Sequence, residues 1–220
     1  FGSLGFFITE SLLNGLFFNN LNFFQRLLSA LFETVSARTA GFTNYSISLD
    51  TISDTGLLLL MTLMFIGAST GGTGGGIKTT TFMALMAATR STLRGQKDVI
   101  ISNRLISDKV ILKAVGITVG SLLFVLLMAM LLSTTNTFVE KEKFTFLEML
   151  FTCISAFATV GFDIGLTSKL NHFGQLILII GMFVGRLGIL LFLSAVWEAL
   201  YKSRMDKQKR IGYPKADLYV

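Results

Sequence analysis

The sequence predicts an all-α membrane protein built from two copies of one unit, which consists of a transmembrane helix, a short re-entrant helix with a loop behind it, and a second transmembrane helix. The first observation is composition: 52% of the 220 residues are hydrophobic and only 15% are charged, against about 25% charged in typical soluble proteins. The others are a set of long apolar segments and an internal repeat. A mean hydropathy of +0.67 excludes most soluble enzymes.

The first unit is expected at residues 1–90. Residues 1–18 are its leading span, although Glu10 and Asn14 are polar for such a place. The chain opens inside this apolar run and without an initiator Met, so we expect a preceding stretch of the protein to be missing.

The second helix of this unit is predicted to be broken. Residues 56–67 are apolar but too short to cross a bilayer, residues 68–76 hold five glycines, and residues 77–88 are apolar again. An interruption near the membrane middle is typical of a discontinuous transmembrane helix.

The second unit is expected at residues 114–200, between two basic clusters. Six Lys and Arg lie at 90–113 and six more at 202–215. Since basic loops remain in the cytoplasm, residues 91–113 are predicted to be a cytoplasmic linker and residues 201–220 a cytoplasmic tail. No nucleic-acid partner is expected, because basic ends of this kind flank spans in any bilayer protein.

Three apolar segments make up the second unit. Residues 114–133 carry no charge and residues 174–197 carry only Arg186, so both are predicted to span, which agrees with two cytoplasmic ends. Residues 146–157 would form a helix of about 18 Å, roughly half the hydrocarbon thickness. That segment is predicted to enter and leave on one side, which requires a watery or protein-lined surrounding.

A motif containing this short helix occurs twice. FETVSA at 32–37 followed by TAGF at 39–42 matches FTCISA at 151–156 followed by TVGF at 159–162. Further on, FIGA at 65–68 matches FVGR at 183–186. The two units are therefore copies of one sequence.

The repeated Thr-x-Gly-Phe predicts a selectivity filter for a monovalent cation. Backbone carbonyls can replace the water of K⁺ in a pore, and glycine allows the backbone angles that aim them inward. A tight turn between two helices is the alternative for one copy, but two copies behind short helices favour a potassium-channel-like filter. The candidate K⁺-binding residues are Thr39, Ala40, Gly41, Phe42, Thr159, Val160, Gly161 and Phe162.

Four segments together resemble the Trk/Ktr/HKT superfamily of potassium-translocating membrane subunits, with the bacterial Ktr-type subunit as the nearest likeness. They are SARTAGF at 36–42, GASTGGTGGGIKTTTF at 67–82, AFATVGF at 156–162 and VGRLG at 184–188. The resemblance implies four repeats, of which this chain holds the third and fourth. It also implies a homodimer and a cytosolic nucleotide-binding regulatory ring. Neither filter has the full TVGYG of potassium channels, so preference for K⁺ over Na⁺ stays open.

The glycine-rich break is interpreted as a gate beneath the filter, which is also the role that the resemblance implies; a passive kink is the alternative. A G-x-S-x-G match at 67–71 lacks the strand and histidine partner of a hydrolase, and Ile77 interrupts a P-loop pattern. Arg186 is expected to face the bundle interior, where it binds loop carbonyls or braces the repeats. The candidate gate residues are Ala68, Ser69, Thr70, Gly71, Gly72, Thr73, Gly74, Gly75, Gly76 and Arg186.

Two charged residues beside the first filter are expected to support it. Arg38 precedes Thr39 and should pair with a carboxylate, for which Glu33 is the candidate. The only cysteine, Cys153, and the only histidine, His172, are interpreted as packing and surface residues.

The sequence thus predicts a multi-pass cell-membrane protein that is no enzyme and holds no cofactor. Its function would be the pore of a potassium uptake system. A Na⁺- or H⁺-coupled symporter is the alternative, with Na⁺ as regulator or coupling ion and Glu10 as the candidate membrane carboxylate. A receptor-like membrane protein is disfavoured by the paired motifs.

Overall fold

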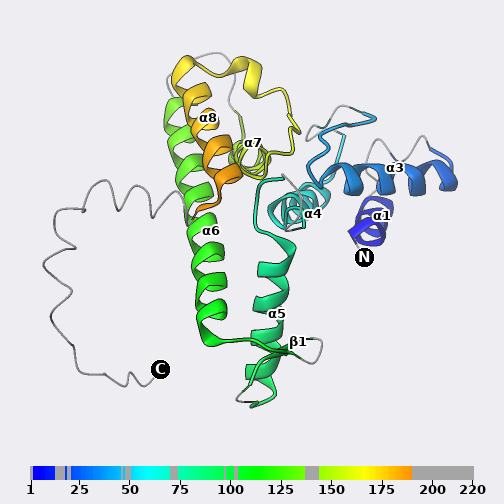
Figure 1. The fold of residues 1–220 in the computed structure, drawn as a ribbon. Helices are drawn as coiled ribbons and strands as arrows, with labels where there is room; N and C mark the ends of the chain where they lie inside the picture. The colour runs from blue at the N-terminus through cyan, green and yellow to red at the C-terminus, as the bar shows by residue number, and fades with distance from the viewer. Residues whose placement is uncertain are drawn as a thin grey trace, which may run out of the picture.

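The computed structural model describes residues 2–12, 18, 21–45, 47, 51–69, 74–96, 98–101, 104–136 and 144–189 (Figure 1). These residues are mostly helical, as predicted. The helices are α1 (Gly2–Leu12), α3 (Phe23–Ser36), α4 (Asp54–Phe65), α5 (Thr79–Leu93), α6 (Asp108–Asn136), α7 (Phe146–Ala158) and α8 (His172–Leu187), with a 3-10 turn at Thr167–Lys169.

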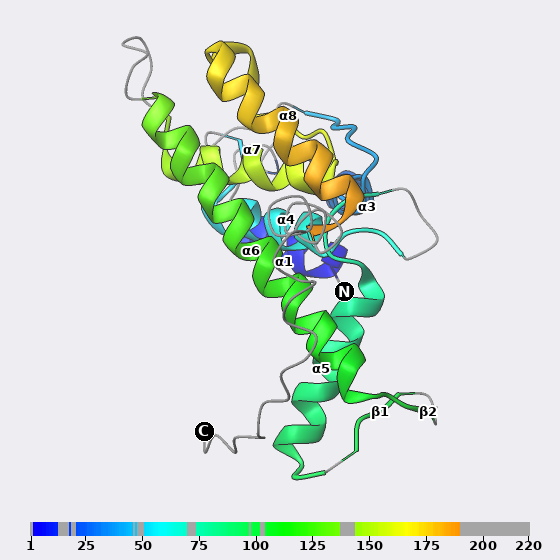
Figure 2. The same ribbon diagram turned by 60° about the vertical axis from the view of Figure 1, so that its left-hand side comes forward.

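The helices form two groups of three that follow the two sequence copies. In the first group α1 packs against α3 and α4, and in the second α6 packs against α7 and α8. Contacts between α4 and α7 join the groups. Helices α5 and α6 lie side by side and extend away from the other helices toward β1 (Figures 1 and 2).

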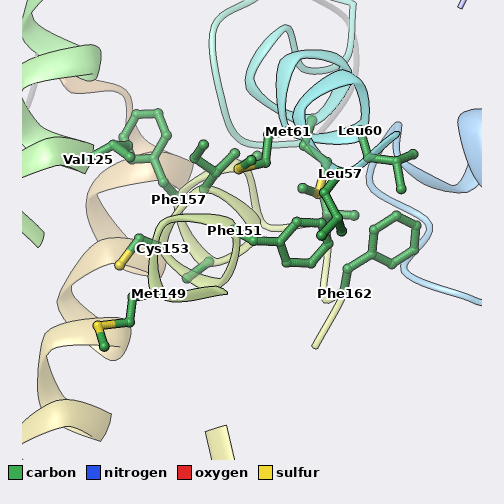
Figure 3. Packing of buried hydrophobic residues seen from close by; sticks show 14 of the residues in the cluster. Leu57, Leu60, Met61, Val125, Met149, Phe151, Cys153, Phe157 and Phe162 are labelled. Carbon is green, nitrogen blue, oxygen red and sulfur yellow. The ribbon is translucent and has the colours of Figure 1, made fainter. Parts of the chain in front are cut away.

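Helix α7 lies at the centre of the core. Nine of its residues are buried, including Phe151, Cys153 and Phe157, and it is enclosed by α4, α6 and α8. Figure 3 shows Phe151 pointing toward Leu57 of α4, with Phe162 beside it, and the rings of Phe151 and Phe162 stack with centroids 6.5 Å apart. The burial of Cys153 agrees with its predicted packing role.

Helix α6 contains the predicted span at 114–133. Among the described helices it alone has the length and apolar composition to cross a membrane, over Asp108–Thr134. Its outer side chains are exposed and apolar, as with Leu123 at 61% and Met130 at 68%. Such a surface suits lipid, in which helices associate through close packing rather than through the hydrophobic effect.

The structure differs from the sequence prediction in the second span of the second unit and in the linker, and it describes only part of the leading span. The span predicted at 174–197 is not one continuous helix, because α8 ends at Leu187 and Gly188 follows with φ 89°. Of the leading span predicted at 1–18, the structure describes α1 at Gly2–Leu12 and residue 18, whereas residues 1 and 13–17 lie outside the described part. The linker predicted at 91–113 contains a hairpin of β1 (Ile100–Ile101) and β2 (Arg104–Leu105), and α6 already begins within it at Asp108.

Candidate ion-binding site

The two Thr-x-Gly-Phe loops follow the ends of two short helices, α3 and α7. The backbone N–H of Asn22 donates to Gln25 Oε1 at 3.0 Å at the start of α3, and that of Thr145 donates to Glu148 Oε2 at 2.7 Å at the start of α7. These contacts satisfy backbone donors that a helix start leaves free. With 14 and 13 residues, each helix is about 20 Å long, less than the ~30 Å of a hydrocarbon core.

Both loops adopt the same uncommon backbone conformation. Thr39 and Thr159 have φ values of 75° and 54°, and they are the non-glycine residues with positive φ in the described part of the chain. Gly41 and Gly161 follow with φ 76° and 96°. Left-handed backbone costs an L-residue about 1–2 kcal/mol, so the surroundings must hold both threonines in place.

A serine at the end of each short helix holds the loop that follows. Ser36 Oγ donates to the Phe42 carbonyl at 2.5 Å, and Ser155 Oγ donates to the Phe162 carbonyl at 2.7 Å. The two serines occupy matching positions of the sequence repeat. The sequence prediction gave them no role, although their identity in both copies was a signal that could have found them.

The two loops meet at their glycines. A Cβ added to Gly41 would collide with the Val160 carbonyl oxygen and lie 3.6 Å from Gly161 Cα, and one added to Gly161 would lie 3.9 Å from Gly41 Cα. The two backbones can approach this closely because Gly41 has no side chain, whereas a Cβ on Gly161 would make only an ordinary van der Waals contact. Segments 120 residues apart in the sequence therefore share one site.

The described ends of the glycine-rich segment lie against both loops. The Gly75 N–H donates to Thr159 Oγ1 at 2.9 Å, and a Cβ on Gly74 would lie 2.8 Å from Thr39 Cγ2. Ala68, Ser69, Gly74, Gly75 and Gly76 are thus placed, whereas Thr70, Gly71, Gly72 and Thr73 are outside the described residues.

The base of this segment is closed by backbone pairing. Ile66 and Ile77 form a parallel bridge. The Gly67 N–H donates to the Ile77 carbonyl at 2.8 Å, and the Ile77 N–H donates to the Phe65 carbonyl at 3.0 Å. Lys78 Nζ adds a bond to the Gly74 carbonyl at 2.6 Å. The two ends of the segment, after α4 and before α5, therefore lie side by side.

The expected pairing of Arg38 with Glu33 is wrong. Arg38 Nη1 donates to the carbonyl oxygens of Ile66 and Gly67 at 2.5 and 3.1 Å. Glu33 is fully buried and its Oε1 accepts from the Asn44 N–H at 3.1 Å, while its Oε2 has no partner within the described part. Each residue contacts main-chain groups instead, which residue spacing alone could not indicate.

Arg186 lies beside the second loop. It is exposed in this chain and lines a cavity of about 430 Å³ together with Ser155, Thr159, Gly161 and Asp163. The preceding Gly185 packs directly on the Phe157 carbonyl at the end of α7. Contact of Arg186 with residues 70–73 falls outside the described residues.

Comparison with known proteins places this arrangement among cation transporters. A family described as "TrkH: Cation transport protein" matches residues 5–199. The chain is 34% identical to "Ktr system potassium uptake protein B" of Bacillus subtilis, over 91% of this chain and 42% of that protein. It is 36% identical to "Potassium/sodium uptake protein NtpJ" of Enterococcus hirae, over 100% of this chain and 46% of that protein.

A solved structure shows the same fold. The potassium transporter TrkH from Vibrio parahaemolyticus matches with a TM-score of 0.68 at 21% identity, over 87% of this chain and 42% of that chain. This chain therefore spans less than half the length of the proteins that it matches.

Proposed function

Because the chain belongs to the TrkH family of cation transport proteins, we propose that it supplies two of the walls of a potassium-conducting pore. The observation that carries the proposal is the contact between the two Thr-x-Gly-Phe loops at Gly41 and Gly161. Two loops with the same backbone conformation that meet at their glycines suit a ring of carbonyls. Such a ring replaces the water of K⁺ as the ion passes.

The rest of the ring would come from sequence outside this chain. Helix α7 is covered by α4, whereas α3 leaves an apolar groove of about 350 Å³ open. In a fourfold arrangement the second helix of a preceding repeat would cover that groove, as α4 covers α7. The relatives' greater length supports two further repeats. The groove is lined by Leu28, Leu31, Phe32, Val35, Ser36, Ala40 and Phe42.

The glycine-rich segment at 68–76 would be the gate. Gly75 and Gly74 contact the side chains of Thr159 and Thr39, which supports a position of the segment beneath the proposed filter. Arg186 would add a positive charge at the same cavity and oppose cation passage until the segment moves. Opening would require breaking the bond between Gly75 and Thr159.

The pore is favoured over a coupled symporter by the position of Glu10. Its Oε1 accepts from Ser53 N at 3.3 Å and from Ser53 Oγ at 2.6 Å, at the start of α4. The break that follows Phe65 is at the other end of this 12-residue helix, about 18 Å along it. The carboxylate therefore caps a helix and does not face the loops.

Topology and assembly are proposed from the family resemblance. The protein would be a multi-pass cell-membrane protein with residues 91–113 and 201–220 in the cytoplasm. It would form a homodimer and bind a cytosolic nucleotide-binding ring through those basic segments. Na⁺ would act as a regulator or as a coupling ion.

The direct test is ⁸⁶Rb⁺ uptake into vesicles that contain the whole protein. Gly161→Ser should reduce K⁺-over-Na⁺ discrimination at least several-fold, because a side chain at φ 96° strains the loop. Gly116→Ser is the matched control, since a Cβ on Gly116 meets nothing within 4 Å. Unchanged flux and selectivity in Gly161→Ser would refute the filter assignment.

A further inference from the structure

Arg38 connects two parts of the molecule that the proposed mechanism treats separately. It follows the end of α3 and directly precedes Thr39 of the first loop. Its guanidinium crosses to the end of α4, where Nη1 donates to the carbonyl oxygens of Ile66 and Gly67 at 2.5 and 3.1 Å. The bonded residues are 28 and 29 positions apart in the sequence.

The acceptors are groups that need a partner. Helix α4 ends at Phe65 with Ile66 as its C-cap, so the carbonyls that follow have no partner in the next helical turn. They also carry the partial negative charge of a helix C-terminus. Within a membrane such groups must be satisfied by the protein. A guanidinium bonds them more strongly than a neutral donor does.

The same two residues form the base of the glycine-rich segment. Ile66 pairs with Ile77, and the Gly67 N–H donates to the Ile77 carbonyl at 2.8 Å. Thr39, the residue after Arg38, lies against Gly74 in the same segment. Arg38 thus contacts the base of the segment at Ile66 and Gly67, and Thr39 contacts its second half at Gly74.

The second repeat has no equivalent. The two positions before Thr159 are Phe157 and Ala158, the last residues of α7, whose backbone is packed by Gly75 and Gly185. Among the described residues, that loop is linked to the segment by the hydrogen bond from the Gly75 N–H to Thr159 Oγ1 and by packing of Gly75 on the backbone of Phe157 and Ala158. The cationic connection is a feature of the first loop.

We propose that Arg38 is a strut that ties the first filter loop to the base of the glycine-rich segment and holds that segment against the filter. The proposal rests on the proposed gate function and adds a positioning residue to it. If the base of the segment moved, the carbonyl oxygens of Ile66 and Gly67 would move away from the Arg38 guanidinium. The gate therefore cannot open fully while both of these hydrogen bonds persist.

The test measures movement of the segment independently of transport. Ala68 is half-buried and close to Gly74, so a cysteine placed there should react slowly with a thiol reagent while the segment is held. The only native cysteine of this chain, Cys153, is buried, and samples without Ala68→Cys give the background. The measurement uses the whole protein in lipid vesicles.

In the Ala68→Cys background, Arg38→Gln should raise the modification rate about tenfold or more, as expected for loss of a charged hydrogen-bond pair. Arg38→Lys keeps the charge without the planar fork, and it should give an intermediate rate. Arg26→Gln is the matched control, because Arg26 lies on α3, the helix that ends just before Arg38, and its Nε donates to the Leu21 carbonyl and not to the glycine-rich segment. It should leave the rate unchanged.

Equal rates in Arg38→Gln and in the parent would overturn the strut. If Arg38→Gln does not yield folded protein, a parental rate in Arg38→Lys overturns it equally. ⁸⁶Rb⁺ flux in the same samples separates the two proposals. A raised modification rate with unchanged flux supports the strut and contradicts the gate, whereas a raised rate with raised basal flux supports both.

Discussion

At the residue scale, each Thr-x-Gly-Phe loop depends on a small number of polar contacts. Thr39 and Thr159 both sit in left-handed backbone, and the hydroxyls of Ser36 and Ser155 hold the carbonyls of the phenylalanines that end the loops. A loop with this backbone keeps its shape only while such contacts persist. The serines therefore belong to the proposed site as residues that hold the backbone of the loops.

Removing these hydroxyls should loosen the filter. We expect Ser155→Ala to lower K⁺-over-Na⁺ discrimination about three- to tenfold, since a typical hydrogen bond contributes about 1 kcal/mol. Ser36→Ala should have a similar effect on the matching loop. Ion competition against ⁸⁶Rb⁺ uptake measures the change.

Thr118→Ala is the control for that experiment. The Thr118 hydroxyl donates at 3.0 Å to the Ala114 carbonyl of its own helix α6, so selectivity should remain at the parental value. Parental selectivity in both serine variants would show that the hydroxyls do not shape the filter.

At the element scale, close approach of backbones decides the packing. Helix α8 lies on α7 because Gly185 has no side chain where it meets the Phe157 carbonyl. Small residues at such contacts are typical of membrane helices. Gly181 follows the same pattern, since a Cβ there would collide with the Met128 side chain of α6.

A side chain at Gly185 should separate α8 from α7. We expect Gly185→Val to lower the thermal midpoint by several degrees or to abolish folded protein, because an overpacked contact costs about 1–3 kcal/mol or more. Size-exclusion chromatography after heating measures this. Gly116→Val is the control, because a side chain at Gly116 meets open space, and it should change stability only through the helix propensity of valine. Equal stability of the two variants would contradict the close packing of Gly185 on α7.

Element positions were largely predictable where hydropathy alone decides them. The short helix predicted at 146–157 is Phe146–Ala158 in the structure, and α6 contains the predicted span. The end of α4 before the glycine-rich segment was also predicted. These helices are limited by glycines, polar links or membrane thickness, which the sequence displays directly.

Other features depend on contacts between distant segments. The apolar run through Gly188 gave no sign that α8 ends at Leu187, because one glycine in such a run is compatible with a continuous helix. The partner of Arg38 is a pair of backbone carbonyls, and a sequence shows only side chains. Charge pairing with Glu33 was therefore the natural but wrong expectation.

At the scale of the whole molecule, two homologous groups of helices meet along one face. The α4–α7 contact joins them, Gly41 and Gly161 lie together, and the glycine-rich segment contacts Thr39 and Thr159. The open groove on α3 and the exposed Arg186 mark where further repeats would close the ring. This arrangement supports the proposal that the chain supplies half of a pore.

The central claim is that the two loops bind the same ion, and heavy-ion occupancy tests it most directly. Anomalous diffraction from crystals of the whole protein grown with Tl⁺ in place of K⁺ would locate the bound cation. If the two loops bind one ion, the anomalous density of Tl⁺ will lie on an axis shared by the carbonyls of residues 39–42 and 159–162. Density confined to one loop, or none between them while Tl⁺ is bound elsewhere in the protein, would contradict it.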